Sequence, residues 1–158
     1  MNTVKRFTFI ASIFFIAVGV ISFFPGAYGP IMMEDPDLII DSNYGRLFGL
    51  FPVNTLINLM HIALGAWGLI AAQDPINAQK FCKFNAVFFG ILTICGMVPG
   101  LSTVFGLAPL FGHSVWLHAI VAVVTGYFGY TVGAQTLSSG ATTYDIDRKR
   151  DDYINKAS

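Results

Sequence analysis

Four long uncharged runs constrain this chain more than any other feature of its sequence. Residues 7–24, 53–72, 84–98 and 114–132 contain no Asp, Glu, Lys or Arg. A helix needs roughly 20 apolar residues to cross a hydrocarbon core about 30 Å thick, so each run is close to one membrane span. The apolar residues are continuous and do not alternate with polar ones, which indicates helices and not the strands of a membrane barrel.

The composition leads to the same class of protein. Of the 158 residues, 54% are hydrophobic and only 11% are charged, whereas a soluble domain carries roughly a quarter charged residues. Nine basic residues are balanced by nine acidic ones, which excludes a nucleic-acid-binding protein with its clustered basic excess. The high hydrophobicity also excludes a disordered chain. We therefore expect an all-α integral membrane protein whose main partner is the lipid bilayer.

The uncharged runs divide the chain into one transmembrane domain and a tail. We expect the domain to cover residues 1–134 and a polar, mobile tail to cover residues 135–158. The four spans are expected at about residues 7–25, 53–72, 81–98 and 114–133, with external loops at 26–52 and 99–113. No A-x-A cleavage site follows the first run, so we interpret it as a retained helix and not as a signal peptide.

The basic residues indicate the orientation of these spans. When four spans are threaded through a membrane, eight of the nine Lys and Arg residues fall on one side and only Arg46 falls on the other. This asymmetry predicts that both termini are cytoplasmic. The first external loop carries the acidic residues Glu34, Asp35, Asp37 and Asp41. Their spacing is not that of a calcium-binding loop, so we expect a solvated loop.

An internal repeat relates the two halves of the chain. The stretches FGLFPVNTLINLMH, residues 48–61, and FGLAPLFGHSVWLH, residues 105–118, share the pattern Phe-Gly-Leu-x-Pro and end in a histidine. Each half holds two spans and enters the membrane in the same sense. The predicted fold is therefore a four-transmembrane-helix bundle made of two parallel helix-loop-helix repeats. Pro52 and Pro109 are expected in the first turn of the second and fourth helices.

Two histidines are the main chemical feature of the spans. If each helix begins at its proline, His61 and His118 lie about 13.5 Å along it, at equal depth near the middle of the membrane. Ionisable groups at such a depth are costly and mark functional sites by default. Small and polar residues share the helix face of each histidine. The candidates are Asn54, Asn58, Gly65 and Gly68 beside His61, and Ser114, Ala122 and Thr125 beside His118.

Three roles fit this pattern. The first, which we expect, is a non-enzymatic structural or accessory component of a larger membrane complex or homo-oligomer, with the histidines in hydrogen bonds between helices. The second is axial ligation of haem b or a chlorophyll-type pigment by His61 and His118. In that role Gly65, Gly68 and Ala122 would leave room for a flat ring. The third is a proton or small-solute pathway through Asn54, Asn58 and His61.

Catalytic and metal-binding motifs are missing from the sequence. It contains neither Gly-x-Ser-x-Gly nor His-Glu-x-x-His, and the uncharged runs hold no carboxylate that could pair with a histidine. We therefore expect no catalytic residues and no enzymatic activity. Cys82 and Cys95 lack metal-type spacing, and on one helix they would lie about 20 Å apart, too far for a disulfide.

The block LFGLFPVNTLINLMHIALGAWGL, together with VWLHAIVAVVTGYFGY, resembles a bacterial membrane family known as domain of unknown function 4383. The motifs that carry the resemblance are Asn54, Asn58, His61 and Gly65, and then Trp116-Leu117-His118. The resemblance implies four membrane spans in a bacterial cytoplasmic or thylakoid membrane, with no assigned activity. This chain has Ile57 where family members often have a further histidine, and Ser114-Val115 where they tend to be more polar.

Overall fold

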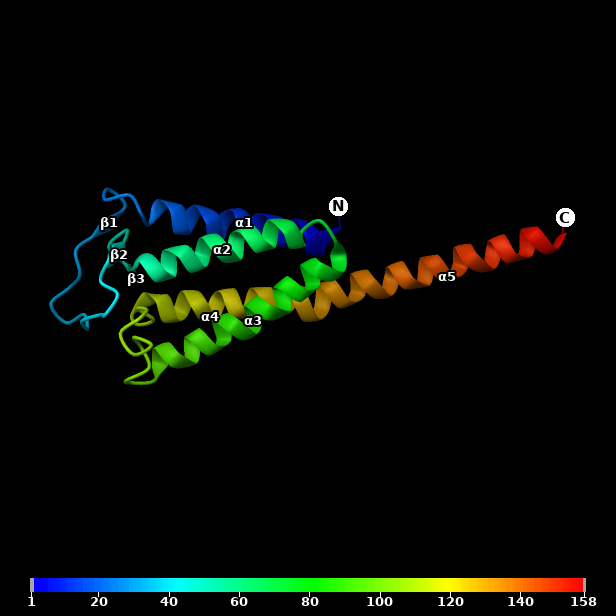
Figure 1. The fold of residues 1–158 in the computed structure, drawn as a ribbon. Coiled ribbons are helices and arrows are strands. Elements are labelled where there is room, and N and C mark those ends of the chain that lie inside the picture. Colours follow the sequence, from blue (N-terminus) through cyan, green and yellow to red (C-terminus); the bar gives the residue numbers. More distant parts are fainter. Residues whose placement is uncertain (1, 158) are drawn as a thin grey trace.

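The computed structural model describes the backbone of residues 2–157 and the side chains of residues 2–144 and 146–150. Most of this part of the chain is helical. The helices are α1 (Thr3–Ile21), α2 (Thr55–Ala71), α3 (Pro75–Met97), α4 (His113–Gly126), the π-helix η1 (Tyr127–Val132) and α5 (Gly133–Ala157). Because α4, η1 and α5 follow one another without a break, they form one long helical rod (Figure 1).

A small sheet in the first long connection corrects the expectation of an all-α fold. The strands β1 (Tyr28–Gly29), β2 (Gly45–Leu47) and β3 (Phe51–Val53) pair antiparallel in the order β1-β2-β3. Phe48 and Gly49 make the turn between β2 and β3 with positive φ angles of 53° and 72°. The sheet satisfies backbone groups of a connection that we expected to be a solvated loop.

Capping side chains determine where two of the helices begin. Asn2 accepts a hydrogen bond from the Lys5 amide at 3.1 Å, so α1 begins several residues before the first uncharged run. Asp74 accepts hydrogen bonds from the amides of Ile76 and Asn77 at 2.9 Å, and Pro75 occupies the first helical position of α3. Both helices therefore extend further toward their N-termini than the predicted spans.

The two prolines of the repeat do not lie in helices, contrary to our expectation. Pro52 belongs to β3, and Pro109 lies in the irregular segment before α4. Since α2 begins only at Thr55 and α4 at His113, His61 and His118 lie about 9 Å and 7.5 Å along their helices. Both histidines are therefore closer to the N-terminal ends of their helices than the proline positions predicted.

The polar tail forms a helix as far as Ala157, and Ser158 lies outside the described residues. α5 continues the axis of α4 and extends beyond the ends of the other helices (Figure 1). Three helical stretches are long and apolar enough to cross a membrane: Thr3–Ile21, Pro75–Met97 and His113–Arg150. α2, at 17 residues, is apolar but shorter. These features are those of a membrane protein.

Close helix packing within two hairpins arranges these elements. α1 packs along α2, and α3 packs along α4, while α3 also contacts α1 and α2. Glycines allow α1 and α2 to approach each other closely. A Cβ atom on Gly19 would lie 2.6 Å from the Asn58 carbonyl oxygen, and one on Gly65 would lie 2.6 Å from that of Ser12. A buried cluster that includes Phe15, Phe81 and Phe89 lies where the hairpins meet.

Candidate functional site

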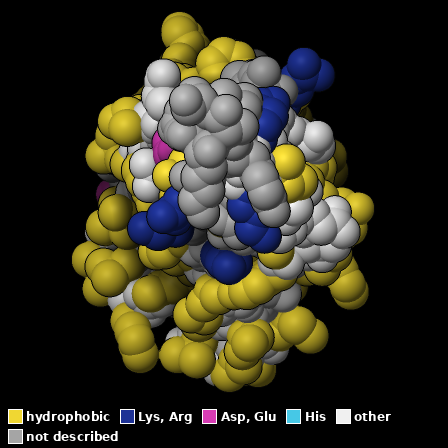
Figure 2. Space-filling view, turned by 90° about the vertical axis from the view of Figure 1, so that its right-hand side faces the viewer, with side chains coloured by type: hydrophobic (Ala, Val, Ile, Leu, Met, Phe, Trp, Pro, Cys, Tyr) yellow, Lys and Arg dark blue, Asp and Glu magenta, His cyan; other side chains and the backbone are white. Residues whose placement is uncertain are grey.

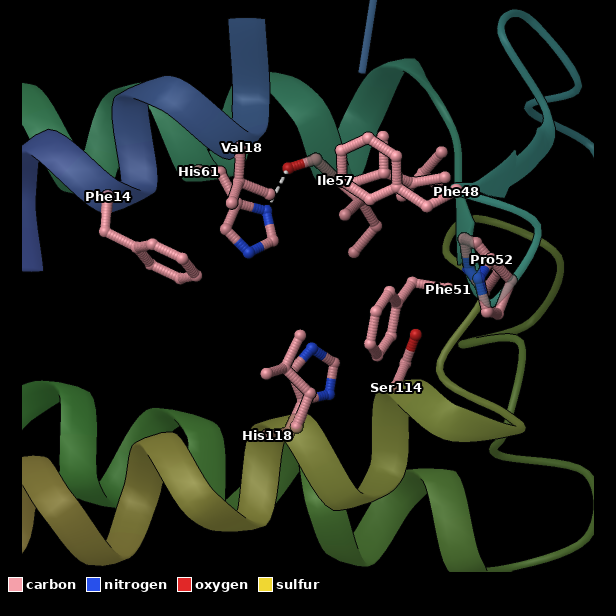
Figure 3. A pocket seen from close by; sticks show the side chains of 13 residues that line it. Phe14, Val18, Phe48, Phe51, Pro52, Ile57, His61, Ser114 and His118 are labelled. Atoms are coloured by element: carbon pink, nitrogen blue, oxygen red, sulfur yellow. Dashed lines mark hydrogen bonds between the residues drawn. The ribbon is translucent and has the colours of Figure 1, made fainter. Parts of the chain in front are cut away.

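A cavity of about 310 Å³ lies between the α1–α2 hairpin and α4, beneath the small sheet (Figure 3). Phe14 and Val18 of α1 form one wall, and Leu117 of α4 belongs to the opposite wall. The sheet and the turn between β2 and β3 form one end of the cavity. The polar side chains in the lining are His61, Ser114 and His118.

His61 presents an unprotonated nitrogen to this cavity. Its Nδ1 lies 2.8 Å from the carbonyl oxygen of Ile57, one turn earlier in α2. Because a carbonyl oxygen only accepts hydrogen bonds, Nδ1 carries the proton and Nε2 of the neutral ring is left with its lone pair. Phe15 and Phe89 hold the ring from two sides, with centroid distances of 5.9 and 6.3 Å. The residue is only 8% exposed.

His118 faces His61 from α4 with an unsatisfied nitrogen. Its ring points into the same cavity (Figure 3) and lies 5.4 Å from that of Phe89. The residue is 4% exposed, and its Nδ1 has no hydrogen-bond partner among the described residues. An unpaired polar atom in apolar surroundings costs about 1–3 kcal/mol, so the position of this ring is unfavourable unless the site serves a purpose other than stability.

The predicted polar residues divide into one that reaches the cavity and three that do not. Ser114 lines the cavity one turn before His118 and is 5% exposed. Asn54 caps α2, accepting from the Ile57 amide at 3.1 Å and donating to two loop carbonyls. Asn58 donates to the carbonyl oxygen of Ser22 at the end of α1. Thr125 donates to a carbonyl of its own helix, α4.

The small residues that we expected to leave room for a flat ring pack against neighbouring helices instead. A Cβ atom on Gly65 would meet α1 at Ser12, and one on Gly68 would lie 2.8 Å from the Phe81 ring of α3. Ala122 packs against the buried cluster that contains Phe89. None of these three is part of the cavity lining. These three small residues therefore serve helix packing and are not walls of the cavity between the histidines.

A second, apolar groove of about 330 Å³ continues from the cavity between α1 and α4. The two spaces share Phe14 and Leu117. Sequence reasoning missed both residues as parts of a site, because an aromatic or aliphatic residue in a membrane helix is equally compatible with lipid contact. Its lining also includes Thr125, whose hydroxyl is already bonded to the Val121 carbonyl oxygen at 2.7 Å.

Residues 5–131 match the sequence profile of a family described as a domain of unknown function, DUF4383. The chain belongs to this family. The match confirms the resemblance carried by the asparagine, histidine and glycine motif of α2 and the Trp-Leu-His motif of α4. No curated protein and no solved structure shows a significant match to the chain. The matched region of this DUF4383 protein includes the sheet and both histidines, whereas α5 lies outside it.

In this DUF4383 protein a buried ion pair supports the sheet, which forms one end of the cavity. Arg46 of β2 donates from Nε to Asp35 at 2.9 Å and from Nη2 to the other carboxylate oxygen. The side chains of Arg46 and Asp35 are only 10% and 2% exposed, which corrects our expectation that all four acidic residues are solvated. The hydrogen bond from Arg46 lowers the pKa of the Asp35 carboxyl. Burial, followed by the charge of Asp35, raises the pKa of Tyr44 to about 12.

Proposed function

We propose that this protein is a non-enzymatic integral membrane protein that binds one small membrane-soluble molecule between His61 and His118. The observation that carries the proposal is a pair of buried imidazoles that face one apolar cavity, one with a bare Nε2 and one with an unpartnered Nδ1. Ligand sites are typically apolar cavities of about this size with a few convergent polar groups. A molecule between the two rings could accept from or donate to imidazole nitrogens that have no hydrogen-bond partner in the part of the chain that the structure describes.

The proposal places the cavity near the outer surface of a bacterial cytoplasmic membrane, with α2 as a fourth span and both termini cytoplasmic. Lys and Arg side chains gather on the face of the molecule from which α5 projects (Figure 2). At the opposite end the sheet carries Arg46, whose charge is balanced by Asp35. This distribution supports the orientation predicted from the sequence. α2 is about 25 Å long, which suits a span at a locally thinned bilayer.

The chemistry of the lining supports binding over catalysis. Activated nucleophiles need a base within hydrogen-bond reach and a third group that orients the base. The side chains that line the cavity include two imidazoles and the Ser114 hydroxyl, and no carboxylate is among them. In the part of the chain that the structure describes, no hydrogen bond joins Ser114 to His118. The lining therefore lacks the relay that a hydrolase would use.

The test is to fill the cavity and measure what the protein retains through purification. We expect a small molecule to co-purify in mild detergent at about one per chain, as measured by mass spectrometry of a solvent extract. Leu117→Trp should remove it, because Leu117 lines both the cavity and the groove. Val123→Trp is the matched control, because Val123 is on the same helix, is 71% exposed and is not in the lining.

An absorption spectrum before and after reduction with dithionite identifies a tetrapyrrole in the same preparation. Bands that sharpen on reduction and disappear in His61→Ala would establish that His61 ligates a haem. That result would replace our proposal of a small molecule held by hydrogen bonds. Equal retention of the molecule by Leu117→Trp and Val123→Trp would overturn the proposed site. Thermal unfolding of each variant shows whether a loss of ligand reflects a loss of fold.

A second proposal, an accessory role in a larger membrane assembly, is supported by α5. This helix extends past the other helices, and its Tyr144 and Ile146 are 69% and 61% exposed. It also contains Gly140, Thr142 and Thr143, which are weak helix formers, so the helix gains from packing against a partner or a second copy. Native mass spectrometry of the full chain and of a chain ending at Gln135 should show a complex only for the full chain.

A further inference from the structure

We infer that the cavity takes a single-chain lipid with a hydroxyl head group, the hydroxyl between His61 and His118 and the chain along the groove between α1 and α4. This inference rests on the proposed function and adds the chemical class of the ligand. It has two parts that the structure supports separately: the hydrogen-bonding character of the two rings, and the shape of the groove that leaves the cavity.

The tautomer of His61 selects the head group. Since Nδ1 donates to the Ile57 carbonyl oxygen, Nε2 can only accept a hydrogen bond from the cavity. A ligand must therefore supply a donor, which an ether, an ester or a bare carbonyl lacks. A hydroxyl donates to His61 and still has lone pairs that accept from a second group. The His118 ring lies on the facing side of the cavity, with one of its nitrogens directed toward His61 (Figure 3).

The charge of the lining excludes anionic head groups. Among the side chains that the structure describes, none that lines the cavity is a Lys or an Arg. Arg46 precedes the lining residue Leu47 on β2, and its guanidinium is already paired with Asp35. A carboxylate or phosphate between the histidines would be buried without a counter-charge, which costs far more than burying a hydrogen-bonded hydroxyl. The polar end of the ligand is therefore neutral.

The groove selects the tail. It is lined by apolar side chains of α1 and α4 and joins the cavity at Phe14 and Leu117. Phe7 and Phe14 both line it, so it extends about 10 Å along α1, in the direction that lipid chains take in a bilayer. Ile10 and Ile120, on its two sides, are 66% and 61% exposed. A single hydrocarbon chain can therefore enter sideways from the lipid and lie between two helices.

Imidazole NMR with matched probes tests this assignment. The chain has three histidines, so selective labelling of histidine with nitrogen-15 yields three ring systems. Decanol and decyl methyl ether carry the same chain, but only the alcohol has a donor. We expect decanol, titrated at constant detergent, to shift the resonances of His61 and His118 and to bind about tenfold more tightly than the ether. The resonances of exposed His113 should not move.

Variants separate the head group from the site itself. In His61→Leu the acceptor is gone, so decanol and the ether should bind equally, with His118 as the reporter. If neither probe shifts a ring in the wild-type protein, the proposed ligand site is wrong. If both bind the wild-type protein equally, the site stands and the hydroxyl assignment is overturned. The nitrogen-15 shifts of the unligated wild-type protein report which ring nitrogen of His61 carries the proton. A proton on Nε2 would also overturn the hydroxyl assignment.

Discussion

The guanidinium of Arg46 holds the carboxylate of Asp35 inside the connection between α1 and α2. Two hydrogen bonds join them, and both side chains are almost completely buried. Arg46 belongs to β2, the central strand of the sheet, and the next residue, Leu47, lines the cavity. The ion pair thus stabilises the end of the cavity that the sheet forms.

Removal of one partner of this pair should open the sheet. Asp35→Asn leaves the Arg46 charge buried without its counter-charge, so we expect a loss of about 3 kcal/mol. Amide exchange of Leu47 and Phe48 should then be about a hundredfold faster. The control is Asp37→Asn, because Asp37 is exposed. Equal exchange rates in the two variants would contradict a stabilising role for the pair.

Acid should have the same effect in the wild-type protein. The pKa of Asp35 is lower in the folded chain than its unfolded value of about 3.9. The stabilisation from this group is therefore complete above pH 4 and is lost as the pH falls through the lower, folded pKa. Amide exchange of β2, corrected for the intrinsic rate, should rise in this range. If Asp35→Asn shows the same increase at low pH, the increase is caused by the titration of a group other than Asp35.

Asn54 should couple the connection between α1 and α2 to the connection between α3 and α4. It caps α2, and its Nδ2 donates at 2.9 Å to the carbonyl oxygen of Ile40 and at 2.8 Å to that of Leu107. Asn54→Ala removes all three hydrogen bonds and should destabilise the protein by about 2 kcal/mol. Amide exchange should increase in both connections together. Asn77→Ala, at an exposed position in the first turn of α3, is the control, and a change confined to one connection would contradict the coupling.

The glycines of α2 should be required for packing and not for ligand binding. In Gly65→Ala the new Cβ would lie 2.6 Å from the Ser12 carbonyl oxygen, so we expect a loss of about 1–3 kcal/mol. Gly90→Ala in α3 meets nothing within 4 Å and should be neutral or stabilising by up to about 1 kcal/mol. Thermal unfolding in detergent measures both. A Gly65→Ala protein as stable as Gly90→Ala would show that the hairpin is not packed this closely.

The proposed orientation can be checked by labelling with a membrane-impermeant maleimide. Cys82 is fully buried, so a Cys95→Ala protein provides a background without a reactive thiol. In bacteria that express the protein, His113→Cys should react in intact cells and Ser139→Cys only after lysis. Both positions are exposed in the structure. The reverse pattern would place the cavity at the cytoplasmic surface.

The positions of the helices could be predicted from the sequence, but their ends could not be predicted by the same argument. Each uncharged run overlaps one of α1 to α4, because the free energy of burying a residue in lipid depends mainly on its type. The helix starts depend on single capping side chains such as Asn2 and Asp74. Counting uncharged residues ignores those groups, although Asp74-Pro75 is a recognisable helix start.

The candidate site was predictable only in its histidines. A repeated motif marks His61 and His118, and an ionisable residue in an apolar run is conspicuous whatever surrounds it. Their small neighbours are ambiguous, because a glycine is equally suited to a cavity wall and to a close helix contact. Phe14 and Leu117, which connect the cavity to the groove, carry no sequence signal that separates them from lipid-facing residues.

By itself, the sequence determined that the chain contains apolar helices and that two of its uncharged runs each hold one histidine. The tertiary structure alone decided what those residues face. Asn54 bonds carbonyl groups 14 and 53 residues away, and the cavity is assembled from α1, α2, α4 and the sheet. Local patterns report the preferences of one segment for lipid, water or helix. The distances between segments depend on how their side chains pack together, which no single segment contains.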